Sequence, residues 1–269
     1  MNAFNITDEQ VATFHEDGFL VVPGLLSDEE TNLLYRIGRA DREIQNIKGG
    51  RLDANGGISR LLVHNALHDD MYSAIVRSER IVNTMEKLLD DEVYHFHHKM
   101  MVKDPRIGGA WEWHQDYGYW YRNNHCLWPD LASCMIALDR ATKENGCLQV
   151  IRGSNKCGRL EHGQIADQTG ADLKRVEALL ERLELVYPEL DPGDALFFHC
   201  NTLHRSDQNR SDKPRWALIC CYNTKHNDPY IYKETSHPPY SHLEKWPDDR
   251  VLEVGRQQWQ QIQAAGTSS

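Results

Sequence analysis

The sequence places a histidine and a carboxylate, His114 and Asp116, two residues apart. If this segment is a strand, the two side chains point to the same side and can reach one point. Further along, an apolar segment at 195–200 leads to two more histidines, His199 and His204. Two histidines and one carboxylate on one face leave coordination positions open, as in the facial triad of non-haem Fe(II) oxygenases.

His204 is the preferred third ligand of this group. His199 lies inside the apolar strand, and we expect it to be a packed, hydrogen-bonded core histidine. A second histidine group, His95, His97 and His98, follows one predicted strand, where alternation places His95 and His97 on one face. We interpret these as polar residues lining a barrel, with a second metal site as the alternative.

An arginine suited to a carboxylate follows the histidines. Arg215 lies eleven residues after His204 and opens the apolar strand Trp216–Cys220. A guanidinium at the start of a buried strand needs an anion, and its planar fork binds a carboxylate in a bidentate manner. The distal carboxylate of 2-oxoglutarate is such an anion, and the 2-oxo acid at its other end can chelate iron.

The order of these motifs resembles the phytanoyl-CoA dioxygenase family. The matching stretches are His114-x-Asp116, Glu144–Ser154, Gly193-Asp194 and the segment from His204-x-Ser206 to Arg215. The opening Asp17–Val21 is also similar to the N-terminal helix and first strand of that family. The resemblance covers about residues 8–235.

The resemblance implies a double-stranded β-helix, a cupin-like jelly roll, with N-terminal helices packed on one side. It also implies an Fe(II)/2-oxoglutarate-dependent dioxygenase that uses O₂ to hydroxylate an unactivated carbon, releasing succinate and CO₂. By this resemblance His114, Asp116 and His204 are the iron ligands. Arg215 holds the distal carboxylate of 2-oxoglutarate, with Ser206 as a second donor.

Two further residues, Lys99 and Gln149, are candidates for the co-substrate pocket. The resemblance places Lys99 where relatives line that pocket, and Lys103 at a position that is usually basic. Gln149, in a predicted strand, is a candidate contact to co-substrate or substrate, with a satisfied polar group in the barrel as the alternative. The family's usual Pro-Gly-Ser-His is Arg152–Asn155 here, and Met135 replaces an aromatic of some relatives. The substrate of a relative is therefore not transferred.

An aromatic segment follows the predicted ligand Asp116 directly. Covalent geometry keeps its first residues near the metal, because each residue advances the chain by at most about 3.6 Å. We therefore predict that Tyr117, Tyr119 or Trp120, together with Arg122 or Arg152, lines the substrate cavity. Such a cavity suits a small charged metabolite: an amino acid, a betaine-like amine or an aminophosphonate. The alternative is a packed aromatic loop, and a long acyl chain would instead require an aliphatic tunnel.

Two other functions use the same residues. A zinc hydrolase also needs three ligands and an open position for water. A catalytically silent binding module of the same fold is the third possibility. Arg215 with Ser206 favours the oxygenase, because a hydrolase has no stated need for them.

The elements that position these residues fall into two regions. Capping-box patterns at Thr7-x-x-Gln10 and Ser27-x-x-Glu30 predict helix starts. Helices are expected at roughly 8–16, 28–44 and 69–90, with a strand at 19–22 and a loop at 45–60. Strands are expected at 93–102, 111–116, 132–139, 147–151, 186–188, 195–200 and 215–223, interrupted by one helix at about 170–184.

This pattern predicts one mainly β domain over 1–269. It has N-terminal helices at about 8–90, a β core at about 92–225, and a C-terminal tail after about 235. Short strands separated by turns indicate a closed or double-layered β structure.

Composition limits the classes of partner. The 269 residues are 40% hydrophobic and 26% charged, as in a globular protein, and no apolar stretch approaches the roughly 20 residues of a membrane span. The net charge of −10 argues against nucleic acid or an anionic membrane as partner. Seven cysteines without a Cys-x-x-Cys pair, and no visible secretory signal, predict a cytoplasmic protein. A small-molecule substrate is expected, and the oligomeric state is left open.

Overall fold

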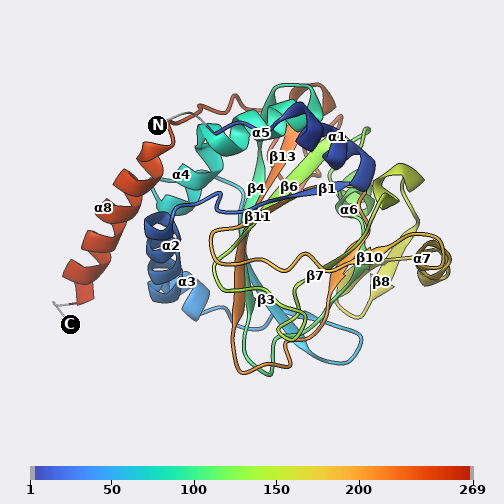
Figure 1. Ribbon diagram of the computed structural model, residues 1–269, viewed down its shortest axis with the longest axis horizontal. Helices are drawn as coiled ribbons and strands as arrows, with labels where there is room; N and C mark the ends of the chain where they lie inside the picture. The colour runs from blue at the N-terminus through green and yellow to red at the C-terminus, as the bar shows by residue number, and fades with distance from the viewer. Residues whose placement is uncertain (1–3, 267–269) are drawn as a thin grey trace.

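The fold is built from two β-sheets that face each other, with most helices packed on the outer side of the larger sheet (Figure 1). The computed structural model describes residues 4–266. All paired strands of both sheets are antiparallel. This is the mainly β, double-stranded β-helix architecture that the sequence predicted.

The strands lie in three sheets. The larger sheet runs in the order β1 (Phe19–Val22), β11 (Ala195–His199), β6 (Leu131–Ala137), β13 (Arg215–Thr224), β4 (Val93–Lys103), β3 (Ile58–His64) and β2 (Arg51–Leu52). The smaller sheet runs β10 (Leu185–Val186), β7 (Leu148–Ile151), β12 (His204–Ser206) and β5 (Trp111–His114). A separate hairpin joins β8 (His162–Ile165) and β9 (Gln168–Ala171).

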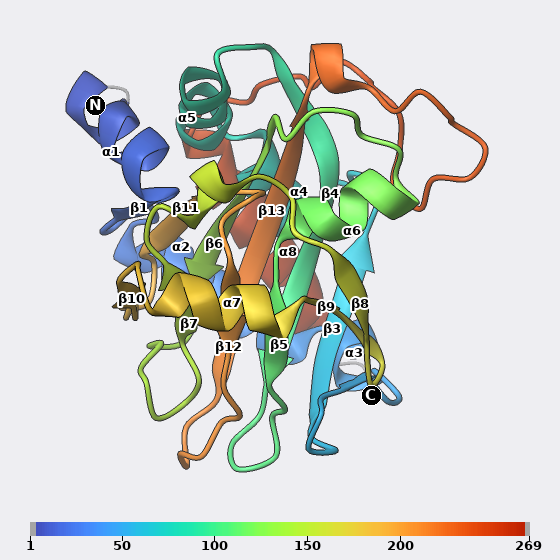
Figure 2. The same cartoon turned by 90° about the vertical axis from the view of Figure 1, so that its right-hand side faces the viewer.

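The helices mostly cover the larger sheet. They are α1 (Asp8–Asp17), α2 (Asp28–Ala40), α3 (Arg42–Gln45), α4 (Met71–Arg77), α5 (Glu79–Leu89) and α8 (Asp249–Gly266). Two others, α6 (Asp116–Asn123) and α7 (Leu173–Leu180), lie nearer the smaller sheet (Figure 2), and the short 3₁₀ helices are η1 (Ser154–Cys157) and η2 (Lys225–Asn227). Both predicted capping boxes form, at Thr7 and Ser27, and fix the starts of α1 and α2.

Strand β13 shows how the sheet separates two cores. Its residues Leu218 and Tyr222 pack with the helices, whereas Ile219 and Cys221 pack between the two sheets. This alternation is the ordinary period of a strand with both faces buried. It places Arg215, on the same face as Ile219, between the sheets.

Two long helices of the prediction are each broken in two. The predicted helix 28–44 is interrupted at Asp41, whose carboxylate accepts hydrogen bonds from the backbone N–H groups of Glu43 and Ile44 and starts α3. The predicted helix 69–90 is interrupted at Ser78, which is extended. The predicted loop 45–60 contains β2 and the start of β3.

The expected C-terminal tail contains α8. Val251 and Val254 of this helix join the outer core, and Gln258 Oε1 accepts a hydrogen bond of 2.8 Å from Met71 N at the start of α4. The helix at 170–184 is also shorter than predicted, because the β8–β9 hairpin precedes it. The sequence also predicted a frayed end at 264–269; residues 264–266 continue α8, and residues 267–269 lie outside the described part of the chain.

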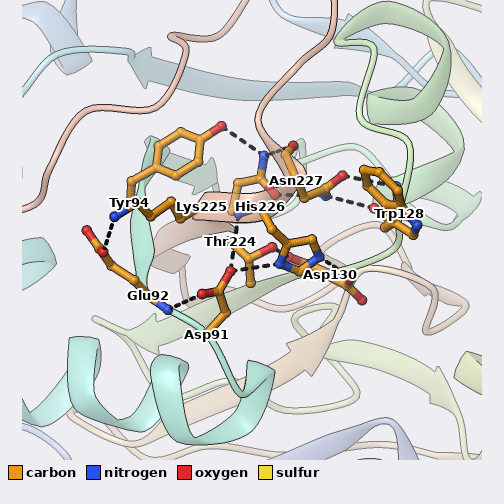
Figure 3. A network of polar contacts seen from close by, with 10 residues as sticks. Asp91, Glu92, Tyr94, Trp128, Asp130, Thr224, Lys225, His226 and Asn227 are labelled. Carbon is orange, nitrogen blue, oxygen red and sulfur yellow. Dashed lines mark hydrogen bonds and ion pairs between the residues drawn. The ribbon is translucent and has the colours of Figure 1, made fainter.

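A polar network at the end of β13 fixes where the chain leaves the larger sheet (Figure 3). His226 Nδ1 lies 2.7 Å from Asp91 Oδ2, and His226 Nε2 lies 2.8 Å from Asp130 Oδ2. The bond to Asp91, with that to Asp130, raises the pKa of His226. Lys225 pairs with Glu92 at 2.8 Å. The segment 228–248, which connects η2 to α8, therefore starts from a fixed point.

No helix in residues 4–266 is long and apolar enough to cross a membrane.

Candidate metal and co-substrate site

The fold brings His114, Asp116 and His204 together between the two sheets. His114 ends β5 and is the direct antiparallel partner of His204 in β12. Asp116 is the first residue of α6. One potential ligand atom from each of the three side chains lies within 4.8 Å of the others. This spacing suits a single metal ion held by two imidazoles and one carboxylate.

Asp116 reaches this group by a different route from the one predicted. The strand expected over 111–116 ends at His114, and α6 begins two residues later, so the two side chains do not share a strand face. The Gln115 amide holds the turn by donating to the carbonyls of Gly158 and Asn201, both at 2.8 Å. The N-terminus of α6 carries positive partial charge, which favours a carboxylate at this position.

Backbone carbonyls orient both imidazoles. His114 Nδ1 lies 2.8 Å from the carbonyl oxygen of Glu112, and His204 Nδ1 lies 2.9 Å from that of Thr202. A carbonyl only accepts, so Nδ1 carries the proton in each ring. Each Nε2 therefore keeps its lone pair for a metal, which is the usual outer support of a histidine ligand.

The electrostatics of the site favour the protonation states that a metal requires. Burial, followed by the neighbouring His114, lowers the pKa of His204 to about 3. Burial alone would raise the pKa of Asp116, but His114, His204 and Lys99 outweigh it and hold that pKa well below its usual range. Two neutral imidazoles and a carboxylate are the forms in which these groups bind a divalent cation.

One cavity connects this group to Arg215. Its lining residues are Lys99, Met101, Trp111, His114, Asp116, Met135, Leu148, Phe198, His204, Ser206, Arg215 and Ile219. Arg215 is 3% exposed and donates from Nη2 to the carbonyl of Gly146 at 2.6 Å, but its buried Nε has no partner. Burial lowers the pKa of Arg215 to about 10, and the unpaired Nε shows that the buried guanidinium lacks a full set of partners. An anion in the cavity would supply them.

Lys103 is a second buried basic side chain, and it lies beside Arg215. The two residues are direct partners across β4 and β13. Lys103 Nζ donates to Ser206 Oγ at 2.9 Å and to the carbonyl of Asp207. Burial, followed by the charge of Arg215, lowers the pKa of Lys103 well below its usual value. Ser206 thus accepts a hydrogen bond from a buried lysine that is paired across the strands with Arg215.

Most of the chain matches one family. Residues 14–217 match the family described as Phytanoyl-CoA dioxygenase (PhyH). This chain belongs to the phytanoyl-CoA dioxygenase family. It is therefore an Fe(II)/2-oxoglutarate-dependent dioxygenase, as its sequence motifs predicted, and this class favours the oxygenase over the hydrolase and the silent module.

Two relatives and one solved structure place this dioxygenase within the family. It is 29% identical over 236 residues to L-proline trans-4-hydroxylase of Streptomyces griseoviridis, covering 80% of this chain and 86% of that protein. It is 26% identical over 257 residues to ectoine dioxygenase of Bordetella bronchiseptica, covering 90% and 81%. The fold matches EctD from S. alaskensis, crystallised with 2-oxoglutarate and 5-hydroxyectoine, with a TM-score of 0.76, 22% identity and coverage of 92% and 89%.

Of the predicted co-substrate residues, the cavity of the dioxygenase contains all but one. Lys99 lines it, and its ammonium has no hydrogen-bond or ion-pair partner among residues 4–266. Gln149 does not reach it. Alternation along β7 turns Leu148 to the cavity, and the Gln149 amide instead bonds Arg205 at 2.8 Å and Asp207 at 2.6 Å. Gln149 is thus the satisfied polar group of the alternative interpretation.

The predicted aromatic wall does not line this cavity. The Tyr117 hydroxyl donates to the carbonyl of Leu127, and Tyr119 is 38% exposed. Trp120 is buried against His97, with ring centroids 5.9 Å apart. The reason is that α6 starts at Asp116 and carries the following side chains around a helix, where an extended chain would have passed over the metal.

The two predicted arginines also lie away from the cavity. Arg122 is exposed on α6. Arg152 forms ion pairs with Asp17 and Glu184 and lies over the ring of Phe19. The arginine that opposes the metal group within the described cavity is Arg215.

The remaining histidines have separate places. His199 Nδ1 accepts a hydrogen bond of 3.1 Å from Asn201 N, and its ring packs near Phe14, as expected of a core histidine. His95 Nε2 lies 3.0 Å from His98 Nδ1, because a bulge in the pairing of β4 with β13 breaks the strand alternation between His95 and His97. In residues 4–266 no second group of three metal-binding side chains comes together.

Sequence reasoning missed His237. It lies in the segment 228–248, which connects η2 to α8. Its ring stacks on that of His97, with centroids 4.0 Å apart and an angle of 11° between the planes. A lone histidine before Pro238-Pro239 gave no periodic signal that could have identified it.

Proposed function

We propose that this dioxygenase hydroxylates a C–H group of a small charged metabolite and releases succinate and CO₂. The observation that carries the proposal is a single cavity with the His114–Asp116–His204 group at one end and Arg215 at the other. Relatives named for L-proline and ectoine support a small charged substrate. An amino acid, a betaine-like amine and an aminophosphonate are the candidate classes.

The roles of the residues follow from their chemistry. His114, Asp116 and His204 would hold Fe(II), and the bound iron with its 2-oxo acid would supply the oxidative chemistry that uses O₂. Arg215 and Ser206 would bind the distal carboxylate of 2-oxoglutarate, since charge-assisted contacts of this kind are strong when buried. The apolar side chains of Phe198, Leu148 and Ile219 line the cavity and would exclude water.

Lys99 would bind an anionic group close to the metal. Its ammonium lies in the same cavity as Asp116 and is close enough for its charge to act on that carboxylate. A cation without a partner in a cavity is a favourable place for a carboxylate. We assign this carboxylate to the co-substrate, so Lys99 would contact 2-oxoglutarate.

The proposed function is tested by loading the protein anaerobically with Fe(II) and 2-oxoglutarate, adding single metabolites, and measuring succinate after oxygen is admitted. Succinate release above the substrate-free level identifies the substrate. His204→Ala is expected to abolish this release and to lower the bound iron per chain, because two ligands remain. His199→Ala is the matched control, since its ring is bonded in the core. Activity that survives His204→Ala but not His199→Ala would contradict the ligand assignment.

We further propose that the enzyme acts in the cytoplasm. All seven cysteines are free, and all but Cys157 are buried. Unpaired thiols are typical of a reducing compartment. Fractionation of cells expressing the full chain tests this, with the soluble cytoplasmic fraction as the expected location.

A further inference from the structure

Two stacked imidazoles lie beside the metal group and have no assigned role. His97 is on β4, two residues before Lys99, so its side chain is on the same face and roughly 7 Å further along the strand. Its direct neighbours across the sheet are Cys221 and then Ser133. Ser133 Oγ lies 3.3 Å from Asp116 Oδ2. His97 therefore lies at the same height along the strands as Ser133, the residue that contacts the Asp116 carboxylate.

His237 comes to this position from the segment 228–248. That segment lies outside residues 14–217, where the chain matches its family. In Figure 2 the segment, drawn in orange-red, loops out beside α6 before it returns to α8. Asn65 holds it, by donating from Nδ2 to the Ser236 carbonyl at 3.0 Å. The stack with His97 thus joins a strand of the family core to a segment that follows the matched residues.

The hydrogen bonds of Asn65 fix the tautomer of His237. Because Asn65 Nδ2 donates to Ser236, the Oδ1 atom of the same amide must accept from His237 Nδ1, at a distance of 2.9 Å. In a neutral ring Nε2 is then an acceptor. Burial lowers the pKa of His237 to about 4, so the ring is neutral at pH 7 and Nε2 keeps its lone pair.

His97 has an unmet need for a polar partner. The ring is 3% exposed, and its buried Nδ1 has no hydrogen-bond partner. Buried polar atoms are rarely left without one, so this atom points to a group that the protein alone does not supply. Trp120 packs against His97 and Phe96 against His237, the latter with ring centroids 4.8 Å apart. Aromatic neighbours therefore hold both imidazoles in place.

We propose that His237 and His97 are specificity-determining residues for the substrate, and that His237 Nε2 accepts a hydrogen bond from an N–H group of a small amino-acid-like molecule. This rests on the proposed function. His97 is in register with Cys221 and Ser133, and Ser133 contacts the Asp116 carboxylate, so a substrate at the stack lies next to the metal group. Among the candidate classes, this favours amines that carry N–H over fully N-methylated betaines.

The test compares the wild type with His237→Phe, which keeps an aromatic ring for the stack but removes the acceptor. The probes are L-amino acids including L-proline, ectoine, and the fully N-methylated counterpart of each amino acid. The readouts are the KM from succinate release and the dissociation constant from anaerobic calorimetry. His237→Gln, which keeps an acceptor, is expected to restore part of the affinity.

The wild type is expected to prefer an N–H-bearing probe to its N-methylated counterpart by at least tenfold in KM. His237→Phe should raise the KM for the preferred probe at least tenfold and remove the preference, while the KM for 2-oxoglutarate changes less than twofold. A role in packing alone would leave the preference unchanged.

The matched control is His242→Phe, in the same segment. His242 is exposed, and its Nδ1 lies 3.1 Å from Glu92 Oε1. This contact does not involve His97 or His237, so the substitution should leave both KM values unchanged. An intact N–H preference in His237→Phe, or a wild type that accepts only N-methylated probes, overturns the inference and leaves the proposed function standing. If no probe stimulates succinate release by the wild type, the proposed function fails and the inference fails with it.

Discussion

At the scale of single residues, the site depends on hydrogen bonds that fix what each side chain can do. Carbonyl partners on the Nδ1 atoms of His114 and His204 leave both Nε2 atoms available to a metal. At the other end of the cavity, Arg215 donates to a carbonyl from Nη2 and leaves its buried Nε without a partner. The protein thus satisfies the atoms that position each group and leaves free the atoms that bind.

Arg215→Ala is predicted to raise the KM for 2-oxoglutarate steeply. Truncating one partner of a buried charged contact costs roughly 2–5 kcal/mol, which corresponds to more than a 10-fold loss of affinity. Arg215→Lys should recover only part of it, because an ammonium does not reproduce the bidentate fork. The measurement is succinate release at varied 2-oxoglutarate. Arg210→Ala, at an exposed residue of the same segment, is the control, and an unchanged KM in Arg215→Ala would refute the assignment.

The metal group and Arg215 could be predicted from the sequence because their residue types are specific to the chemistry. The direction in which the neighbouring side chains point could not be predicted from the sequence. Whether Gln149 faces the cavity depends on the phase of β7, and the neighbouring Leu148 is equally compatible with either face. The role of His237 depends on Asn65, a contact 172 residues away that no local pattern reveals.

At the scale of elements, local signals predicted starts better than ends. Capping boxes at Thr7 and Ser27 correctly located α1 and α2, because a cap is a contact between residues three apart. The break at Ser78 has a distant cause. The backbone N–H of Glu79 donates to the carbonyl of Trp246 at 2.9 Å, so the interruption is paired with the segment that leads to α8.

The ion pair between α2 and α5 gives a prediction at this scale. Arg80 donates to Glu30 from Nη2 at 2.6 Å and from Nη1 at 3.0 Å, and both side chains are buried. Arg80→Ala would leave the Glu30 carboxylate buried without its cation, a change that costs about 3–5 kcal/mol. Urea unfolding at pH 7 measures this.

The control for Arg80 is Arg250→Ala. Arg250 pairs with Glu253 one turn later on the exposed face of α8. Exposed pairs of this type contribute less than about 1 kcal/mol, so the free energy of unfolding should barely change. Equal losses in the two variants would show that burial of the Arg80–Glu30 pair does not matter.

At the scale of the whole molecule, the helices and the C-terminal region complete what the β core begins. The family match ends at residue 217, within β13, yet α8 packs on α2 and α4 and its Arg256 pairs with Glu29 at 2.6 Å. The mainly β architecture was predictable because most strands are short and bounded by turn residues. The docking of α8 could not be predicted from the sequence, because it depends on contacts between the two ends of the chain. The single-domain organisation stays a prediction.

The histidines buried in the larger sheet couple the stability of the whole molecule to pH. His95 and His98 lie in β4, and burial, followed by neighbouring histidines, lowers the pKa of each to about 3. His98 stacks on His64, with ring centroids 5.0 Å apart, and its buried Nε2 has no hydrogen-bond partner among the described residues. Among the described residues, no carboxylate forms a hydrogen bond or ion pair with either ring, so protonation in the folded state is unfavourable.

The metal-free protein is therefore predicted to lose stability as the pH falls below about 6.5. The unfolded chain binds protons at its histidines there, near their ordinary pKa of 6.5, whereas the folded chain does not until about pH 3. One such histidine contributes about 2 kcal/mol of stability at pH 7 that is lost by pH 5. Urea unfolding at pH 7, 6 and 5 measures the slope. His98→Gln should flatten it, whereas His15→Gln, at an exposed histidine, should not. A slope that His98→Gln leaves as steep as in the wild type would contradict this account.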